Sequence, residues 1–233
     1  MRIFLNDRVV EFVAEKPENQ LPSDFVVVYQ SPERLQEAWL DFERYEKYMK
    51  FIIIDQPNEP GKSDSCSASV RFSSFSEVFP SFKAFMSFFK YVPAAGGLVK
   101  NEKGEFLFIH RLGFWDLPKG KIENKDIREE GSTIHDNLSA RAAAIREVIE
   151  ETGLISVTIS GNLPSTWHIY TAKEKRILKQ TMWFEMAADS SQPLKPQTSE
   201  GIFLVKWTRP DAIHCILSHT YASIRELLLE VIF

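Results

Sequence analysis

The chain has 233 residues, of which 44% are hydrophobic and 26% charged, and its formal net charge is −4. These values fit one large or two small globular domains and exclude a general nucleic-acid binder. No apolar run reaches the length of a membrane span, and the apolar start of the chain is too short and too soon polar to be a signal peptide. Cys66 and Cys215 are too far apart for a disulfide framework or a zinc site. We therefore expect a soluble protein of a reducing, cytoplasmic compartment, with neither a nucleic-acid nor a membrane partner.

Residues 1–91 are predicted to form a small α/β domain of unknown role. Its expected elements are strands at 2–5 and 8–13 around a turn at Asn6-Asp7, a strand at 24–29, a helix from Ser31-Pro32 to about Lys47, and a strand at 51–54. Residues 56–68 are rich in Pro, Gly, Ser and Asp and predict an exposed loop. No catalytic constellation precedes residue 93, so the sequence assigns this domain no chemistry.

A run of phenylalanines closes this first domain, and from Pro80 onward its spacing suits a helix. Its members are Phe72, Phe75, Phe79, Phe82, Phe85, Phe88 and Phe89. One interpretation is core packing or a seam between the two halves of the chain. The other is a homodimer surface or a groove for a partner.

Residues 92–233 are predicted to form a second domain, which begins at Val92-Pro93. We expect a hairpin of strands at 94–99 and 105–111, an extended segment at 115–122, a helix at 139–152, strands near 155–160, 166–172, 177–187 and 202–207, and helices at 211–216 and 221–231. This order predicts a mixed sheet covered by helices.

The helix at 139–152 carries the most informative residues. Ser139 is its expected N-cap and Gly153 its C-terminal stop. Its apolar face is predicted to comprise Ala142, Ile145, Val148 and Ile149. Glu147, Glu150 and Glu151 have i, i+3 and i+4 spacing, so their carboxylates share one face near the helix C-terminus, where the dipole disfavours anions. Such oxygen donors suit Mg²⁺ or Mn²⁺, although a solvated acidic face would show the same spacing.

Two stretches together resemble the Nudix box. Arg146–Leu154 matches its Arg-Glu-U-x-Glu-Glu-x-Gly-U half, where U is a bulky aliphatic residue, and Trp115–Glu123 is similar to its opening strand and loop. The resemblance covers residues 92–233 and implies the Nudix fold, an α/β/α sandwich with a mixed sheet, here preceded by the small α/β domain. It also implies metal-dependent hydrolysis of a nucleoside diphosphate linked to another group.

The resemblance implies a set of site residues. Metal ligands are expected at Gly120, through its carbonyl group, and at Glu147, Glu150 and Glu151, and Arg146 is expected to orient these carboxylates. Lys119, Lys121 and Arg111 are candidates for binding a small phosphorylated substrate, although a loop lysine is more often simply solvated. Glu200, in a late loop, is a candidate general base or a surface charge. Among the strand aromatics Trp167, Tyr170, Trp183 and Phe184, which could stack on a base or fill the core, Trp183 is the chosen substrate contact. The histidines show no ligand spacing.

The box departs from its pattern at one position. Counted back from Arg146, the first box glutamate falls on Leu138, and the spacing from Gly120 shows a twelve-residue insertion between Glu123 and Leu138. This insertion contains Asp126, Glu129, Glu130, His135 and Asp136. One of its acidic residues could fold back to supply the missing carboxylate, and we choose Glu129 or Glu130. A polar surface loop is the alternative.

The expected function is therefore a metal-dependent pyrophosphohydrolase. The run Leu117–Lys121 resembles that of relatives acting on dinucleoside polyphosphates or diphosphoinositol polyphosphates. A nucleotide or phosphate sensor, or an interaction scaffold, is the alternative that Leu138 and the insertion support. An isomerase acting on a prenyl diphosphate has no supporting feature.

Overall fold

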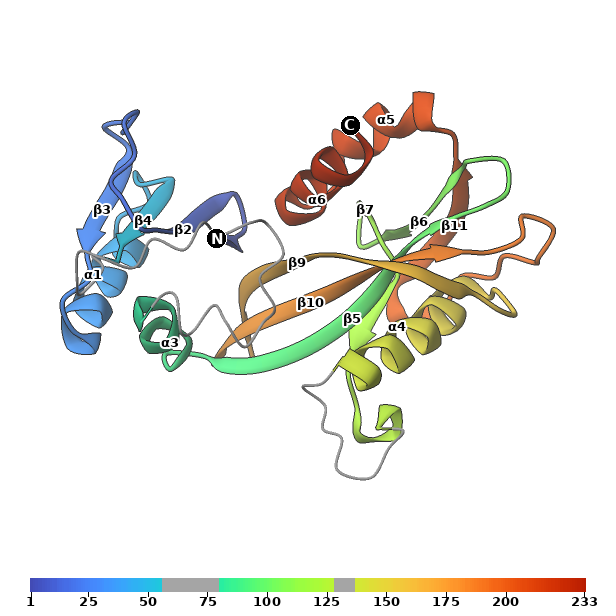
Figure 1. Cartoon of the computed structure of the whole chain (residues 1–233), viewed down its shortest axis with the longest axis horizontal. Helices are drawn as coiled ribbons and strands as arrows, with labels where there is room; N and C mark the ends of the chain where they lie inside the picture. The colour runs from blue at the N-terminus through green and yellow to red at the C-terminus, as the bar shows by residue number, and fades with distance from the viewer. Residues whose placement is uncertain (56–79, 128–136) are drawn as a thin grey trace. The chain divides into compact units, whose positions relative to one another are not determined.

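The computed structural model describes residues 1–55, 80–127 and 137–233 (Figure 1). They form two compact units, Met1–Tyr91 with His168–Leu178 and Val92–Trp167 with Lys179–Phe233. The sequence-based division had placed His168–Leu178 with the C-terminal domain, whereas its contacts place it with the N-terminal unit. The predicted loop at 56–68 and most of the insertion lie outside the described residues. Within the described part, no helix is long and apolar enough to cross a membrane.

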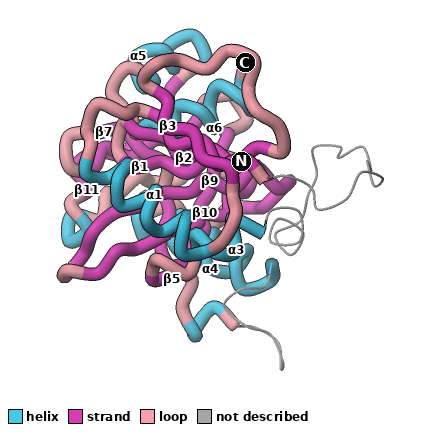
Figure 2. Tube along the Cα trace, turned by 90° about the vertical axis from the view of Figure 1, so that its left-hand side faces the viewer, coloured by secondary structure: helices cyan, strands magenta, loops and turns pink. Residues whose placement is uncertain are grey.

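The first unit contains a four-stranded arrangement in the order β1-β2-β4-β3. Its elements are β1 (Arg2–Leu5), β2 (Arg8–Val13), β3 (Asp24–Val28), α1 (Pro32–Arg44), β4 (Lys50–Ile54) and α3 (Pro80–Met86). Strands β1 and β2 form the predicted hairpin, and β4 runs parallel to both β2 and β3. Helix α1, labelled beside these strands in Figure 2, packs on β3 and α3. It is capped by Ser31 as predicted but ends before Lys47, because Tyr45 adopts an extended conformation.

The core of the first unit is aromatic. Phe82 and Phe85 are buried, and each ring packs edge-on against Phe12 with centroids 5.5 Å apart. Trp39 of α1 is fully buried and also meets Phe85 edge-on, at 5.0 Å. For these phenylalanines the core interpretation is confirmed; a homodimer stays a prediction.

The second unit is built on strands in the order β11-β6-β5-β10-β9, with β7 paired to β6 and β8 paired to β5. Its strands are β5 (Lys90–Lys100), β6 (Phe106–Arg111), β7 (Phe114–Asp116), β8 (Lys119–Lys121), β9 (Thr158–Ala172), β10 (Lys175–Ala187) and β11 (Ile202–Thr208). The outer ends of β5, β9 and β10 belong to the first unit. Strand β9 is continuous, whereas the sequence had suggested two strands at 155–160 and 166–172.

Helices cover both faces of this sheet, as Figure 1 shows for α4 and α6. Helix α4 (Asn137–Thr152) packs its small residues Ala140, Ala143 and Ala144 on one face, and α5 (Ile213–Leu217) and α6 (Ala222–Ile232) cover the other. The α/β/α sandwich with a mixed sheet, preceded by a small α/β unit, is thus confirmed.

Two details of α4 differ from the sequence-based prediction. Ser139 is buried inside the helix, so it is not the N-cap. The buried face runs through Ala140, Ala143, Ala144 and Val148 rather than through Ala142 and Ile145, because alanines allow the helix to approach the sheet closely. Gly153 does end the helix, with a φ of +77°.

Candidate active site

The three glutamates of α4 occupy three different environments. The side chain of Glu150 is 41% exposed, that of Glu147 is 14% exposed and that of Glu151 is 3% exposed. The helix therefore does not present a uniformly solvated acidic face. Two of its carboxylates are held inside the protein and need partners there.

Arg146 supplies partners for two of these carboxylates. Its Nη1 atom donates to Glu147 at 2.7 Å and to Glu150 at 3.1 Å, and its Nη2 atom donates to the main-chain oxygen of Lys121 at 3.0 Å. The surrounding carboxylates raise the pKa of Arg146 far above its ordinary value. Arg146 therefore contacts the carboxylates that the family resemblance expects it to orient.

Asp126 is the third carboxylate partner of Arg146; it was one of the candidates within the insertion, but Glu129 or Glu130 was the predicted choice. It is fully buried in a short turn, and its two oxygens accept from Nε and Nη2 of Arg146 at 2.8 and 2.9 Å. Burial acts to raise the pKa of Asp126, but the hydrogen bonds and charge of Arg146, together with the backbone N–H of Glu123 and the charge of Lys125, outweigh it and leave that pKa below its ordinary value. Asp126 thus gives Arg146 a buried carboxylate partner.

The signal for Asp126 was present in the sequence. It stands six residues after Gly120, which is the spacing of the first box glutamate. Counting back from Arg146 leads to Leu138 instead, because the extra residues of the insertion lie between Asp126 and the register of the helix. Leu138 is a largely exposed residue in the first turn of α4, and Glu129 and Glu130 lie outside the described residues.

Gly120 and Glu147 are in direct contact. A Cβ atom added to Gly120 would lie 2.1 Å from the carboxyl carbon of Glu147 and 2.2 Å from both of its oxygens. The carboxylate therefore fills the space that the glycine leaves open. Burial raises the pKa of Glu147 despite the neighbouring guanidinium of Arg146.

Glu151 points away from Arg146 and towards β8. One of its oxygens accepts from the main-chain N–H of Lys119 at 2.8 Å, and the other lies 3.5 Å from Nη1 of Arg111. Burial is the main cause that raises the pKa of Glu151 to about 7, and Lys119 only partly opposes it. A carboxyl group with such a pKa can gain or lose a proton near neutral pH.

Arg111 connects Glu151 to Glu200. Its Nη2 atom lies 3.0 Å from a carboxylate oxygen of Glu200, which ends the short turn Thr198–Glu200. Two residues far apart in the sequence are thus brought to the same guanidinium. The structure places the candidate base Glu200 beside the buried box glutamate.

The lysines differ from one another. The Lys119 ammonium forms an ion pair with the buried carboxylate of Asp116, whereas Lys121 is exposed. Lys179 of β10, which sequence reasoning did not select, lies among the same charges. Its pKa is lowered to about 8, mainly by burial and also by the charge of Lys119, while Asp116 opposes this shift.

Trp183, the predicted substrate contact, is buried in the core. Trp183 is 1% exposed, belongs to the core under α5 and α6, and donates its indole N–H to Thr166 at 2.9 Å. No ring face of Trp183 is therefore open to a substrate. Period-two alternation alone could not decide this, because it separates two faces of a strand without saying which one is covered.

The donor set fits a divalent cation such as Mg²⁺ or Mn²⁺. Glu147 and Glu150 both accept from Nη1 of Arg146, so their carboxylates lie close together, and Glu147 lies against the backbone of Gly120. Carboxylate and carbonyl oxygens are hard donors of the type that these ions accept. In the described part of the chain, no three His, Cys, Asp or Glu side chains are grouped closely enough to hold an ion as they stand.

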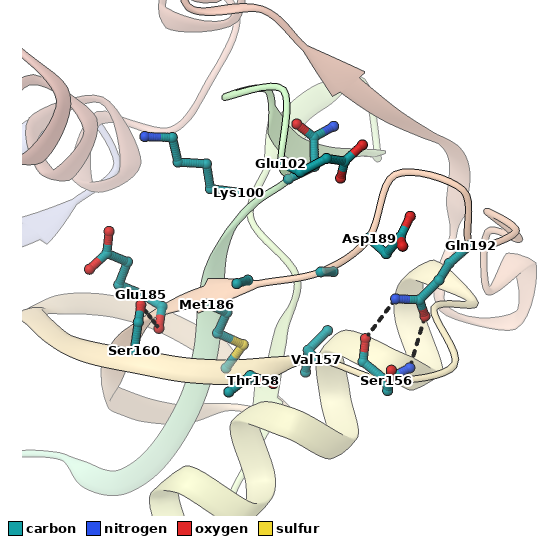
Figure 3. Close-up of a pocket in the computed structure, with 13 residues that line it drawn as sticks. Lys100, Glu102, Ser156, Val157, Thr158, Ser160, Glu185, Met186, Asp189 and Gln192 are labelled. Atoms are coloured by element: carbon teal, nitrogen blue, oxygen red, sulfur yellow. Dashed lines mark hydrogen bonds between the residues drawn. The ribbon is translucent and has the colours of Figure 1, made fainter.

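A shallow pocket of about 500 Å³ lies elsewhere on the second unit (Figure 3). Its polar groups are used internally: the Gln192 side chain accepts from the N–H of Ser156 at 2.9 Å and donates to its carbonyl at 3.1 Å, and Ser160 donates to the carbonyl of Glu185. None of the residues discussed above lines it. The candidate site is therefore the region around α4 and β6–β8 rather than this pocket.

Comparison with known proteins shows the family of the chain. Residues 90–230 match the family model described as a NUDIX domain. The match spans more than half of the chain, and the chain belongs to the Nudix family.

Solved structures with a related fold include bacterial, archaeal and animal proteins. The MutT protein from Methanosarcina mazei is 23% identical, with 61% of this chain and 93% of that chain covered and a TM-score of 0.43. A Caenorhabditis elegans Ap4A hydrolase complex is 25% identical, with 60% and 93% covered and a TM-score of 0.43. The Escherichia coli ORF135 protein is 17% identical, with 62% and 90% covered and a TM-score of 0.40.

Proposed function

We propose that the chain is a divalent-metal-dependent pyrophosphohydrolase acting on a nucleoside diphosphate linked to another group, with dinucleoside polyphosphates as the first class to test. The observation that carries the proposal is the arrangement around Arg146. This residue pairs with buried Asp126 and holds Glu147 and Glu150, so Arg146 has three carboxylate partners although Leu138 is not acidic. That arrangement weakens the reason for expecting an inactive sensor.

Glu147, Glu150 and Glu151, with the carbonyl group of Gly120, are the residues that would hold Mg²⁺ or Mn²⁺. When bound, such an ion neutralises charge on the pyrophosphate oxygens and helps to position the attacking water. Arg146 keeps two of the carboxylates oriented. Arg111 and Lys119 supply positive charge for the phosphate chain, and phosphoryl transfer depends mainly on such positioning and charge stabilisation.

Glu200 is the proposed general base. Its carboxylate is about half exposed and is held by Arg111, which also reaches Glu151. There it can accept the proton that the attacking water loses as the new P–O bond forms and the bridging P–O bond breaks.

The test is a substrate panel assayed with Mg²⁺ or Mn²⁺ and with a chelator. Wild-type protein should release a nucleoside monophosphate or polyphosphate, and the Glu150→Gln, Glu151→Gln double variant should be at least about 100-fold slower. Glu230→Gln, an exposed glutamate on α6, is the matched control and should retain activity. Nucleotide binding without turnover of any compound would instead favour the sensor function.

A further inference from the structure

Two aromatic rings form a stacked pair next to the candidate site. The rings of Phe114 and Tyr221 have centroids 5.0 Å apart and an angle of 30° between their planes. Phe114 begins β7, and Tyr221 immediately precedes α6. Tyr221 backs one side of Phe114, and 45% of Phe114 remains exposed. A large ring that is supported but not covered is a surface on which another flat ring can stack.

The hairpin register places Phe114 beside the site. Phe114 pairs with Arg111 across a two-residue turn in which Leu112 and Gly113 both have positive φ, +49° and +89°. This is the type of turn that fixes the register of a tight hairpin. Opposed residues of an antiparallel pair extend to the same face. The phenyl ring is therefore on the same face as the guanidinium that contacts Glu151 and Glu200.

The backbone around the pair is firmly held. The N–H of Trp115 donates to the carbonyl of His219 at 2.8 Å, and the hydroxyl of Thr220 donates to the carbonyl of Trp115 at 2.7 Å. These bonds join β7 to the segment that carries Tyr221. The two rings are thus positioned before any ligand arrives, which limits the ordering cost of binding.

We propose that Phe114, backed by Tyr221, is the platform on which the base of a nucleotide substrate stacks, with the phosphates directed towards Arg111 and Lys119. The inference rests on the proposed function and narrows its substrate class to compounds that carry a base. It disfavours diphosphoinositol polyphosphates, which offer no flat ring. Burial raises the pKa of Tyr221, Asp116 also raises it, and Lys119 and Arg111 lower it, so these three charged groups lie near the ring pair.

Equilibrium binding tests the platform separately from catalysis. Calorimetry without a divalent ion compares AMP with ribose 5-phosphate, which has the same phosphate and no base. Wild-type protein should bind AMP about 10- to 100-fold more tightly, a difference within the range that base stacking on an aromatic ring provides. Phe114→Ala should remove most of this preference, and Phe114→Trp should restore it.

Phe233→Ala is the control, because it also deletes a strongly exposed phenylalanine of the same unit. It should keep the wild-type preference, and the melting temperature of each variant shows whether it is folded. The platform is refuted if wild-type protein shows no preference for AMP, or if folded Phe114→Ala keeps it. A persistent preference without turnover of any compound would overturn the proposed hydrolase and leave the platform standing.

Discussion

The side chain of Arg146 forms hydrogen bonds with several acidic side chains at once. Its guanidinium meets Asp126, Glu147 and Glu150 together with a main-chain oxygen. Removing one acceptor from such a network leaves buried charge unpaired, which costs more than the interaction itself contributes. The consequences of single substitutions here can therefore be predicted from burial and partners.

Asp126→Asn should lower the free energy of unfolding at pH 7 by about 3 kcal/mol, because it breaks a buried ion pair while keeping the shape of the side chain. The pKa of Asp126 is below its ordinary value of 3.8, so its stabilising contribution is present above pH 3.8 and is lost as the pH falls through the lower folded value. Urea unfolding at several pH values should show the two proteins converging in acid.

The control for that experiment is Asp211→Asn, which weakens the ion pair between Arg209 and Asp211. The side chain of Arg209 is 70% exposed and that of Asp211 is 67% exposed. Exposed pairs contribute less than about 1 kcal/mol. An equally small loss in Asp126→Asn would contradict the importance assigned to the buried pair.

Glu151 gives a second prediction, with the opposite pH dependence. Its folded pKa of about 7 exceeds its ordinary value of 4.5, so the folded chain keeps a proton that the unfolded chain has lost. The contribution of Glu151 to stability is therefore greatest below pH 4.5, and it falls by about 3 kcal/mol as the pH rises through 7. In a chelator, Glu151→Gln should show a smaller loss between pH 5 and 8.

Adding Mg²⁺ completes the Glu151 experiment. An ion that binds the ionised carboxylate of the folded chain stabilises that state. Wild-type protein at pH 8 should gain melting temperature on adding Mg²⁺, and Glu151→Gln should gain less. Identical pH profiles and identical responses to Mg²⁺ would show that Glu151 does not titrate as inferred.

Gly120 and Gly96 both pack closely against neighbouring elements, but a side chain added at each would meet different kinds of atoms. At Gly120 of β8 the three atoms nearest to an added Cβ all belong to the carboxyl group of Glu147, the flexible end of a side chain. At Gly96 of β5 it would meet the carbonyl oxygen of Pro118 at 2.4 Å and the ring of Trp183 at 2.7 Å. Neither a carbonyl group nor a buried indole can readily move aside.

Gly120→Ala should therefore remain folded, with a loss of about 1 kcal/mol or less, yet turn over substrate at least about tenfold more slowly because Glu147 is displaced. Gly96→Ala should lose about 1–3 kcal/mol through overpacking. Thermal unfolding and steady-state assays on both variants check the contrast. If Gly120→Ala kept full activity, the position of Glu147 would not matter to the reaction.

Local patterns predicted most elements but not how they meet. Helical spacing, Ser31 and Gly153 predicted α1 and α4 because caps and periodicity act within one turn. The burial of Ser139 and the exposure of Phe114 depend on which elements cover them, and no local pattern contains that. Asp126 was considered but not chosen for another reason: twelve extra residues follow it before the helix register resumes, so counting back from Arg146 placed the box glutamate on Leu138.

At the scale of the whole molecule, the most unexpected feature is the membership of the β9–β10 hairpin. Both strands begin or end in the Nudix unit, yet their connecting segment, His168–Leu178, clusters with the N-terminal unit. The chain therefore passes between the two units three times, after Tyr91, Trp167 and Leu178. A single proteolytic cut after Tyr91 would sever residues 1–91 from the rest of the chain, and only the noncovalent contacts of His168–Leu178 within the N-terminal unit would then hold the two fragments together.

Arg176 is the residue through which this hairpin segment is anchored within the N-terminal unit. Its Nη2 atom lies 2.5 Å from a Glu43 oxygen, and its guanidinium lies over the rings of Trp39 and Phe89, 5.2 and 4.8 Å from their centroids. A partly desolvated cation over aromatic rings adds about 1–2 kcal/mol. Arg176→Met keeps much of the apolar stem but removes the charge, so it isolates the electrostatic part of this anchor.

We expect Arg176→Met to speed amide hydrogen exchange across His168–Leu178 and α1, and to leave exchange in α4 unchanged, because α4 packs on a different core. Arg34→Met is the control, since the Arg34–Glu37 pair on α1 is about 70% exposed on both sides and contributes little. Faster exchange throughout the Nudix unit would mean that the hairpin couples the folding of the two units. Unchanged exchange at the hairpin tip would show that the aromatic contacts hold it without the charge.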